Sequence, residues 1–311
     1  IYLAAIDSLL GDNTPEADVT LLDVARTSAN IRSKQKSHVL QSSSLGRGRT
    51  TVVWPPLQTI DTAVVFGDSE PGVGAHRDER VDYAWPGVVT FVPEAVNFLI
   101  PCSDGKKAGG DALHPAGLLE VPSSGWLFSI ESVLPPENNP AQSAAPVPSV
   151  MAPVAGFQYG VPTLGMNEYI TMRQRGIAGM RIDRTAGPIF QSGITTSLTS
   201  GQKNINRRRM ADFIEDSLAR ALNPFCKLPL TTSLKDAALG EVVAFLDQLL
   251  SPNNPAAQRI SDYDVDSKSG NTPDLEAQGI FVIIVRVRTL ATSDFIVLQA
   301  QIGEGVIIQR S

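Results

Sequence analysis

The chain of 311 residues contains only two cysteines, Cys102 and Cys226, and three histidines. Two cysteines are too few for a disulfide scaffold, and because neither has a CxxC partner, the ligand count excludes a structural zinc site. His38, His76 and His114 stand in no hydrolase motif, and the GxSxG pattern of serine hydrolases is absent. No apolar run reaches about eighteen residues, so the sequence predicts no direct membrane insertion. These absences predict a protein with no catalytic site, metal site or cofactor.

An excess of positive charge is also lacking. The formal net charge is −6 and the sequence pI is about 5.2, which argues against nucleic acid or an anionic membrane as the main partner. Hydrophobic residues make up 42% of the chain and charged residues 19%, as in an ordinary globular protein near the size where one domain becomes two. Because Ile1 is not methionine and opens an apolar, helix-like run, we expect that an amino-terminal element precedes it.

The first part of the chain alternates between apolar runs and polar stretches, which is the pattern of an α/β layer. We predict a helix at residues 2–10, a helix followed by a loop at residues 27–49, and strands at residues 19–24, 60–66 and 88–92. The order strand, helix, strand favours parallel pairing of the first two strands.

Proline becomes dense at residues 121–162, most of all in the segment PPENNPAQSAAPVPSVMAP. Because proline donates no backbone hydrogen bond and fixes its own φ, we predict an extended loop or linker there, with a proline-rich loop at about residues 133–155. Short strands are predicted at residues 177–182 and 189–196, separated by Gly187 and Pro188.

The last third of the chain has the clearest periodicity. Apolar residues recur at helical spacing over residues 205–222 and 234–250, which predicts two amphipathic helices. Residues 280–288 and 295–302 are predicted strands that a short connection could join into a hairpin. The fold class expected is therefore mixed α/β (α+β).

Three segments resemble ligand-binding loops, but they lack the residues that such loops need. The aspartate run at residues 262–266 starts like an EF-hand calcium loop, but Ser267 stands at the sixth position and Pro273 at the twelfth, so we predict a solvated acidic loop. The glycines of residues 46–49 and 72–74 are not followed by the Lys and Ser/Thr of a phosphate-binding loop, so we predict turns.

Three adjacent arginines, Arg207, Arg208 and Arg209, begin the first of the two predicted helices. Positive charge at this end of a helix opposes the helix dipole, so these cations need another reason to be there. One explanation is ion pairing with Asp212 or Glu215 on a solvated helix face. The other is a basic patch that meets an acidic partner surface, and the sequence leaves both open.

The end of the chain is apolar to within a few residues of Ser311. An apolar terminal strand with exposed hydrogen-bonding groups needs a partner, either in its own sheet or in a neighbouring chain. The residues that we single out as a candidate inter-subunit strand are Phe295, Ile296, Val297, Leu298, Ile302 and Val306.

Seven short motifs occur in the same order as in one known family. The chain resembles the tail sheath proteins of contractile phage tails and related injection systems. The resemblance is diffuse, extends over the whole chain and is most specific in the last third. The motifs lie at residues 78–86 (DERVDYAWP), 121–125 (VPSSG), 167–177 (NEYI and GI), 193–197 (GITTS), 205–215 (INRRR and FIE), 270–279 (GNT and G) and 294–298 (DFIVL).

The resemblance implies a sheath-type α/β core at residues 1–195. It also implies an inner, tube-facing domain at residues 196–311, made of two helices and a small sheet that neighbouring subunits complete. A β-arm at about residues 294–311 would supply one of the strands. The arginines at residues 207–209 would then contact the inner tail tube.

The implied function is that of a structural subunit in a contractile tail. Copies of the chain would stack as hexameric rings into a helical sheath around the inner tail tube and contract to drive that tube through a target envelope. The other implied partners are the baseplate and the tail terminator. The implied location is the virion tail, after assembly in the host cytoplasm. The alternatives are a soluble α/β hydrolase-like enzyme and another virion structural protein, such as a baseplate component.

Overall fold

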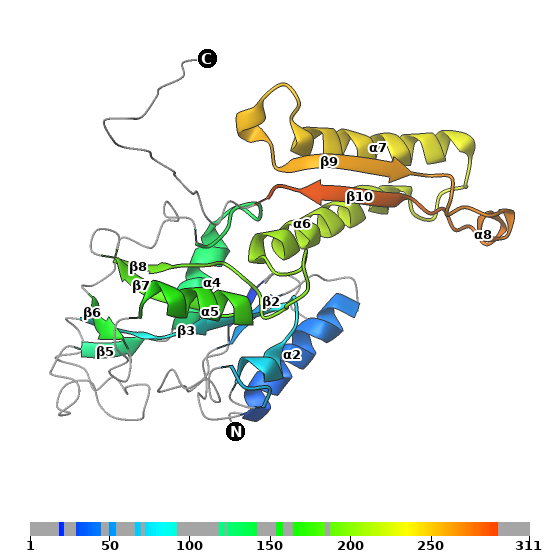
Figure 1. Ribbon diagram of the computed structural model, residues 1–311. Helices are drawn as coiled ribbons and strands as arrows, with labels where there is room; N and C mark the ends of the chain where they lie inside the picture. Colours follow the sequence, from blue (N-terminus) through cyan, green and yellow to red (C-terminus); the bar gives the residue numbers. More distant parts are fainter. Residues whose placement is uncertain are drawn as a thin grey trace, which may run out of the picture.

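The computed structural model describes ten segments of the chain: residues 19–21, 29–44, 50–53, 66–69, 72–91, 118–121, 123–141, 154–157, 164–183 and 187–291 (Figure 1). The predicted helix at residues 2–10 and the carboxy-terminal strand at residues 295–306 lie outside these segments. So do residues 60–65 of the second predicted strand and residues 142–153 of the proline-rich loop.

We call the elements that precede α6 (Ile205–Leu222) the first part of the molecule, and α6 with the elements that follow it the second part. A five-stranded sheet forms the centre of the first part, with strand order β1-β2-β3-β7-β8. The first four strands pair in parallel, and β8 is antiparallel to β7. The strands are β1 (Val19–Leu21), β2 (Thr50–Val53), β3 (Val81–Trp85), β7 (Ala178–Asp183) and β8 (Gly187–Phe190). All five residues of β3 are buried, as expected for the middle strand of a covered parallel sheet.

A second, antiparallel sheet of three strands has the order β5-β4-β6. Its strands are β5 (Leu118–Val121), β4 (Val88–Phe91) and β6 (Val154–Phe157). β4 follows β3 after a turn of two residues that contains a cis peptide bond between Trp85 and Pro86. The two sheets are therefore linked directly at the end of a buried strand.

Helices cover the five-stranded sheet. They are α2 (Ala29–Ser44), α4 (Ser123–Val133) and α5 (Met166–Arg175), with a 3-10 turn η1 (Val73–His76). α4 packs against β1, β2 and β3, while α2 packs against β2 and α5 against β7. Leu127 and Ile130 of α4 join Tyr83 and Trp85 of β3 in the apolar core of this part.

The second part begins with α6 (Ile205–Leu222), which runs along a long helix, α7 (Thr232–Leu250), and a two-stranded sheet (Figure 1). The sheet consists of β9 (Ile260–Asp266) and β10 (Ile284–Thr289), and smaller elements connect these pieces: η4 (Asn223–Phe225), η5 (Pro255–Ala257) and α8 (Pro273–Ala277). A separate apolar cluster fills the space between helices and sheet, with Met210, Ile214, Val242, Leu246 and Ile260 buried in it. None of the described helices is both long enough and apolar enough to cross a lipid bilayer.

Several sequence predictions are confirmed. α6 has the predicted bounds, α7 begins two residues earlier than predicted, and strands lie at β1, β4 and β7 as expected. The predicted parallel pairing around α2 is also present, although the strand that follows α2 is β2 at Thr50–Val53. The prediction had placed that strand at residues 60–66.

Three predictions were wrong. The proline-rich stretch predicted as loop contains α4 and β6, because the prolines at positions 122 and 135 lie on either side of the helix and not in it. Gly187 and Pro188 lie inside β8, so that strand precedes most of residues 189–196. The acidic segment at residues 262–266 belongs to β9, because its aspartates alternate with Tyr263 and Val265, which pack against the helices.

Candidate assembly interface

The small sheet of the second part pairs β9 and β10 in antiparallel register from Ile284 opposite Asp266 to Thr289 opposite Ile260. Across the pair, Arg286 forms an ion pair of 2.7 Å with Asp264. Tyr263, Val265, Val285 and Val287 pack against the apolar cluster beneath. The sheet therefore has one face on the helices and one facing away from them, as is usual for antiparallel sheets at a surface.

Each of these two strands is paired on one side only within the part of the chain that the structure describes. An unpaired side presents a row of backbone N–H and C=O groups that can accept another strand. Two-stranded sheets are marginal on their own, and additional strands stabilise them. The geometry therefore offers two positions, beside β9 and beside β10, where a strand could be added.

The helical platform under the sheet is fixed by local hydrogen bonds. The Thr231 hydroxyl accepts from the Leu234 N–H and caps α7. The Tyr263 hydroxyl of β9 donates to Asp247 of α7 at 2.7 Å, and this hydrogen bond is the main cause that raises the pKa of Tyr263 to about 12. The Arg259 N–H donates to the Leu249 carbonyl and holds the entry to β9 against the end of α7. The sheet and α7 are thus linked at the start and at the middle of β9.

The GNT motif organises the connection from β9 to β10. The Asn271 amide donates to the carbonyls of Ser267 and Val282, and its oxygen accepts from the Val282 N–H at 2.8 Å. Thr272 caps α8 by accepting from the Leu275 N–H. These bonds close the loop and direct the chain into β10, which is a structural role for a motif that we had identified only by resemblance.

The three arginines at the start of α6 have different environments. Arg208 forms ion pairs with Asp212 at 2.5 Å, with Glu79 at 3.0 Å and with Glu215 at 3.5 Å. Asp212 also pairs with Arg80 at 2.9 Å. The ion pairs with Asp212 and Glu215, one of the two explanations from the sequence, are therefore present. They also join the DER motif of the first part to α6.

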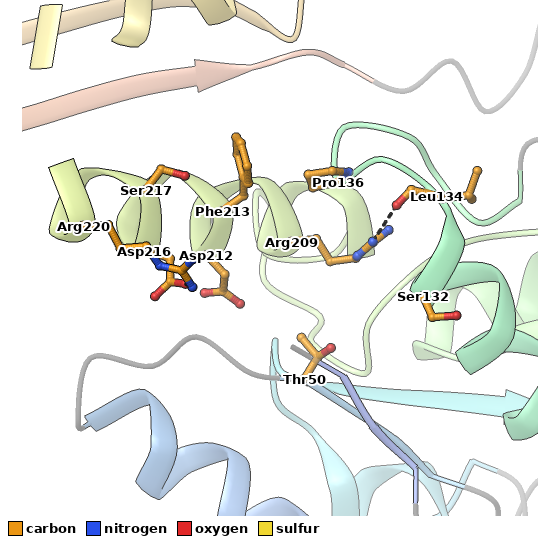
Figure 2. Close-up of a pocket in the computed structure, with 10 residues that line it drawn as sticks. All are labelled: Thr50, Ser132, Leu134, Pro136, Arg209, Asp212, Phe213, Asp216, Ser217 and Arg220. Carbon is orange, nitrogen blue, oxygen red and sulfur yellow. Dashed lines mark hydrogen bonds and ion pairs between the residues drawn. The ribbon is translucent and has the colours of Figure 1, made fainter. Parts of the chain in front are cut away.

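Arg209 fastens α6 to the end of α4. Its Nη2 donates to the carbonyl oxygen of Glu131 at 2.5 Å. It also donates to the carbonyl oxygen of Leu134 at 2.8 Å (Figure 2). The third arginine, Arg207, is half-buried, and no hydrogen bond or ion pair joins its guanidinium to another described residue in the structure. The predicted tube contact of Arg207, Arg208 and Arg209 stays a prediction, and of the three only Arg207 has no such partner among the described residues.

A cavity of about 360 Å³ lies between α6 and the end of α4 (Figure 2). Arg209, Asp212, Asp216 and Arg220 line it from α6, and Thr50 of β2 lines it from the sheet. Its α6 wall carries two acidic residues between two basic ones, so the cavity lies between the two parts of the molecule, next to their shared ion pairs.

An apolar groove of about 500 Å³ lies at the other end of α6. Leu222, Leu230, Leu234 and Phe281 line it, together with Cys226, whose thiol is free and which is exposed. The groove opens beside the segment that leads into β10.

Among the described residues, no three side chains of His, Cys, Asp or Glu gather where they could hold a metal ion. The candidate inter-subunit residues Phe295, Ile296, Val297, Leu298, Ile302 and Val306 lie outside the described part of the chain, so their pairing stays a prediction. Sequence reasoning missed Arg80 as a partner of α6, and it missed Asp82 and Glu131, two buried carboxyl groups near Arg209. No local pattern in a single sequence distinguishes these residues from solvated ones.

Solved structures with the same fold were found, whereas no protein-family model and no curated protein matches the sequence. A chain of the anti-feeding prophage (AFP) baseplate superposes with a TM-score of 0.66 at 16% identity; the match covers 95% of this chain and 72% of that one. A chain of the contracted PVC sheath complex, from an extracellular contractile injection system, gives 0.65 at 15% identity, covering 95% and 74%.

The sheath tail protein DSY3957 from Desulfitobacterium hafniense superposes with a TM-score of 0.57 at 12% identity. That match covers 93% of this chain and 60% of the Desulfitobacterium protein, so the chain spans less than two thirds of that relative. Identities this low establish the fold. The chain therefore has the fold of the sheath proteins of contractile injection systems.

Proposed function

We propose that the chain is a structural subunit of a contractile injection tail, which polymerises into a helical sheath around an inner tube and contracts to drive that tube forward. The observation that carries the proposal is the β9–β10 sheet, which rests on α7 with one side of each strand unpaired among the described residues, in a chain with the sheath fold. The domain boundaries at residues 1–195 and 196–311 belong to the same proposal.

Subunits would be linked by strand addition. In this mode backbone hydrogen bonds supply affinity and alternate side chains set the register. β10 has six residues, and a strand of similar length beside it would form a few hydrogen bonds worth about 1 kcal/mol each, plus apolar burial. The candidate donor is the segment that contains Phe295, Ile296, Val297, Leu298, Ile302 and Val306. Such a link can hold neighbours together while whole subunits rotate.

Donating a strand to the next copy is a heterologous contact, and heterologous contacts that do not close on themselves give helical arrays. Contraction would then be a rigid-body rotation and outward shift of subunits about these links. The proposed partners are further copies of the chain in stacked hexameric rings, the inner tail tube, the baseplate and the tail terminator. The proposed location is the tail of a virion or related particle, after assembly in the host cytoplasm.

Electron microscopy of the full-length protein, expressed with its tube partner, tests this function. We expect long striated tubes in the extended state, or wide rods and rings in the contracted state, and fast-sedimenting material in the ultracentrifuge. A small closed oligomer as the only species would contradict the proposal. No observation on the described residues supports the alternative that the chain is a hydrolase-like enzyme.

A baseplate component is the second candidate, because one of the structures with this fold is a chain of the AFP baseplate. The same microscopy separates the two roles. A baseplate component would bind one end of a tail and form no long tube by itself.

Arg207 gives a sharper test of the tube contact than reversing all three arginines, because Arg208 and Arg209 also hold the fold together. Arg207→Glu should weaken cosedimentation with preassembled tubes roughly tenfold, as removal of a contact between opposite charges would, and should leave the melting temperature unchanged. Arg220→Glu is the matched control, because Arg220 is an exposed arginine on the same helix. Equal losses from both substitutions would mean that Arg207 makes no specific tube contact.

A further inference from the structure

Two carboxyl groups are buried at the junction between the two parts of the molecule, where β3 and α4 meet α6. Asp82 of β3 and Glu131 of α4 are both 0% exposed. Within the described part of the chain, none of their four carboxylate oxygens receives a hydrogen bond. Buried carboxylates without hydrogen bonds are costly in their charged form, so this pair is not explained by stability of the fold alone.

Among the described residues, the positive charge that acts on both carboxyl groups is that of Arg209 of α6. Arg209 is held in place at the end of α4 by its hydrogen bonds to the carbonyls of Glu131 and Leu134. Figure 2 shows the bond to Leu134. Of the described elements, β1 and β2 also pack closely against α4, and neither Val19–Leu21 nor Thr50–Val53 contains a titratable side chain. One guanidinium therefore faces two carboxyl groups.

This charge balance favours a bound proton. One carboxylate can be neutralised by Arg209, and a second would be an uncompensated charge at a buried site. Burial accordingly raises the pKa of Glu131 to about 8 against the opposing charge of Arg209. Burial, followed by the charge of Glu131, raises the pKa of Asp82 well above its ordinary value.

We propose that Asp82, Glu131 and Arg209 form a proton-linked latch, which holds α6 against α4 and β3 while the carboxyl pair keeps one proton and loosens when that proton is lost. The latch lies next to the cavity of about 360 Å³ that Arg209 and Leu134 line, which gives water a path to the charges when the junction loosens (Figure 2). In any assembly that the chain forms, the latch would determine the stability of the contact between the first and second parts of the molecule.

The direction of the pH effect follows from proton linkage. In the unfolded chain Glu131 ionises near its ordinary pKa of 4.5, and in the folded protein it ionises near 8. Between these values the folded state holds a proton that the unfolded state has released, so the free energy of unfolding falls as the pH rises. Below pH 4.5 and above about pH 8 the two states hold this proton equally, and the effect of this group becomes constant.

Melting temperatures measured from pH 5 to pH 9 test the latch. The wild-type melting temperature should fall by about 5 °C more over this range than that of Glu131→Gln, in which Arg209 and Asp82 form a balanced pair. Asp82→Asn should flatten the profile in the same way, which keeps the test valid if one variant does not fold. Asp216→Asn removes an exposed carboxylate from α6 and should keep the wild-type slope.

Two further measurements distinguish a latch from a merely buried acid. The double variant Asp82→Asn with Glu131→Gln removes both of the buried carboxylates that act on Arg209, so it should melt below both single variants at every pH. In the wild type, hydrogen exchange corrected for intrinsic rates should accelerate from pH 6 to pH 9 at the end of α4 and the first turns of α6, but not in Glu131→Gln. Parallel melting profiles for wild type and both single variants, or exchange that accelerates evenly across the molecule, would overturn the proposal.

Discussion

Replacing Asp212 by alanine is expected to lower the free energy of unfolding by about 3 kcal/mol, because it leaves two nearly buried guanidinium groups without their shared counter-ion. Asp212 pairs with Arg80 through one carboxylate oxygen and with Arg208 through the other, at 2.9 and 2.5 Å. The side chains of Arg80 and Arg208 are only 6% and 13% exposed. Water can therefore replace little of the negative charge and hydrogen bonding that the Asp212 carboxylate gives to the two guanidinium groups. Urea unfolding of the purified subunit measures the loss.

The same helix offers a matched control. Asp216 pairs with Arg220 at the same spacing of four residues, but the Arg220 side chain is 78% exposed. Exposed pairs contribute little, so Asp216→Ala should change the free energy of unfolding by less than about 0.5 kcal/mol. Similar losses from the two alanine substitutions would show that ion pairing between the DER motif and α6 does not hold the two parts together. A double-mutant cycle with Arg80→Met should give a coupling energy above about 1 kcal/mol for the Arg80–Asp212 pair.

The parts of this fold that could be predicted are those whose pattern is local and periodic. Met210, Ile214 and Leu218 recur at helical spacing because one face of α6 packs against one apolar cluster, and Val242 and Leu246 do the same in α7. The ion pairs from Arg208 to Asp212 and Glu215 were also accessible, since residues four and seven positions along a helix share its face. Both predictions require only the sequence of the helix itself and no knowledge of what it packs against.

The elements that were missed have a misleading average composition. Prolines on both sides of α4 obscured the helical spacing of Leu127 and Ile130 inside it. In β9 the aspartates suggested a solvated loop, although their alternation with Tyr263 and Val265 is the period of a strand with one exposed face. In both cases the correct signal was the position of the apolar residues, not the number of polar ones.

The junction could not be predicted from the sequence because its partners are far apart along the chain. Arg80 meets Asp212 and Arg209 meets the end of α4 only after the two parts have folded against each other. Asp82 stands between Val81 and Tyr83 in a strand of ordinary apolar character, and Glu131 lies in a short helix. Only the arrangement of β3, α4 and α6 in space makes these carboxyl groups a pair.

Removing residues 292–311 is the second change for which we expect a large effect, namely the loss of tube formation with the fold retained. The described structure ends at residue 291, just beyond β10, and every described member of both apolar clusters precedes the deletion. The truncated subunit should therefore melt within about 2 °C of the full-length chain while its assembly is lost. A large fall in melting temperature would mean instead that this segment pairs within its own chain.

Mixing the truncated and full-length chains separates strand donation from other causes of failed assembly. A truncated subunit keeps the sides of β9 and β10 that are unpaired among the described residues, so in the proposed mechanism it can accept a strand but lacks the proposed donor segment. Because a helical array grows by repeated donation, each truncated copy that joins should end a line of links, and sheath length should fall steeply as its proportion rises. Leu298→Pro should act in the same way, since proline removes a donor from the added strand. Unchanged sheath lengths in the mixture would show that the tail of the chain is not the link between neighbours.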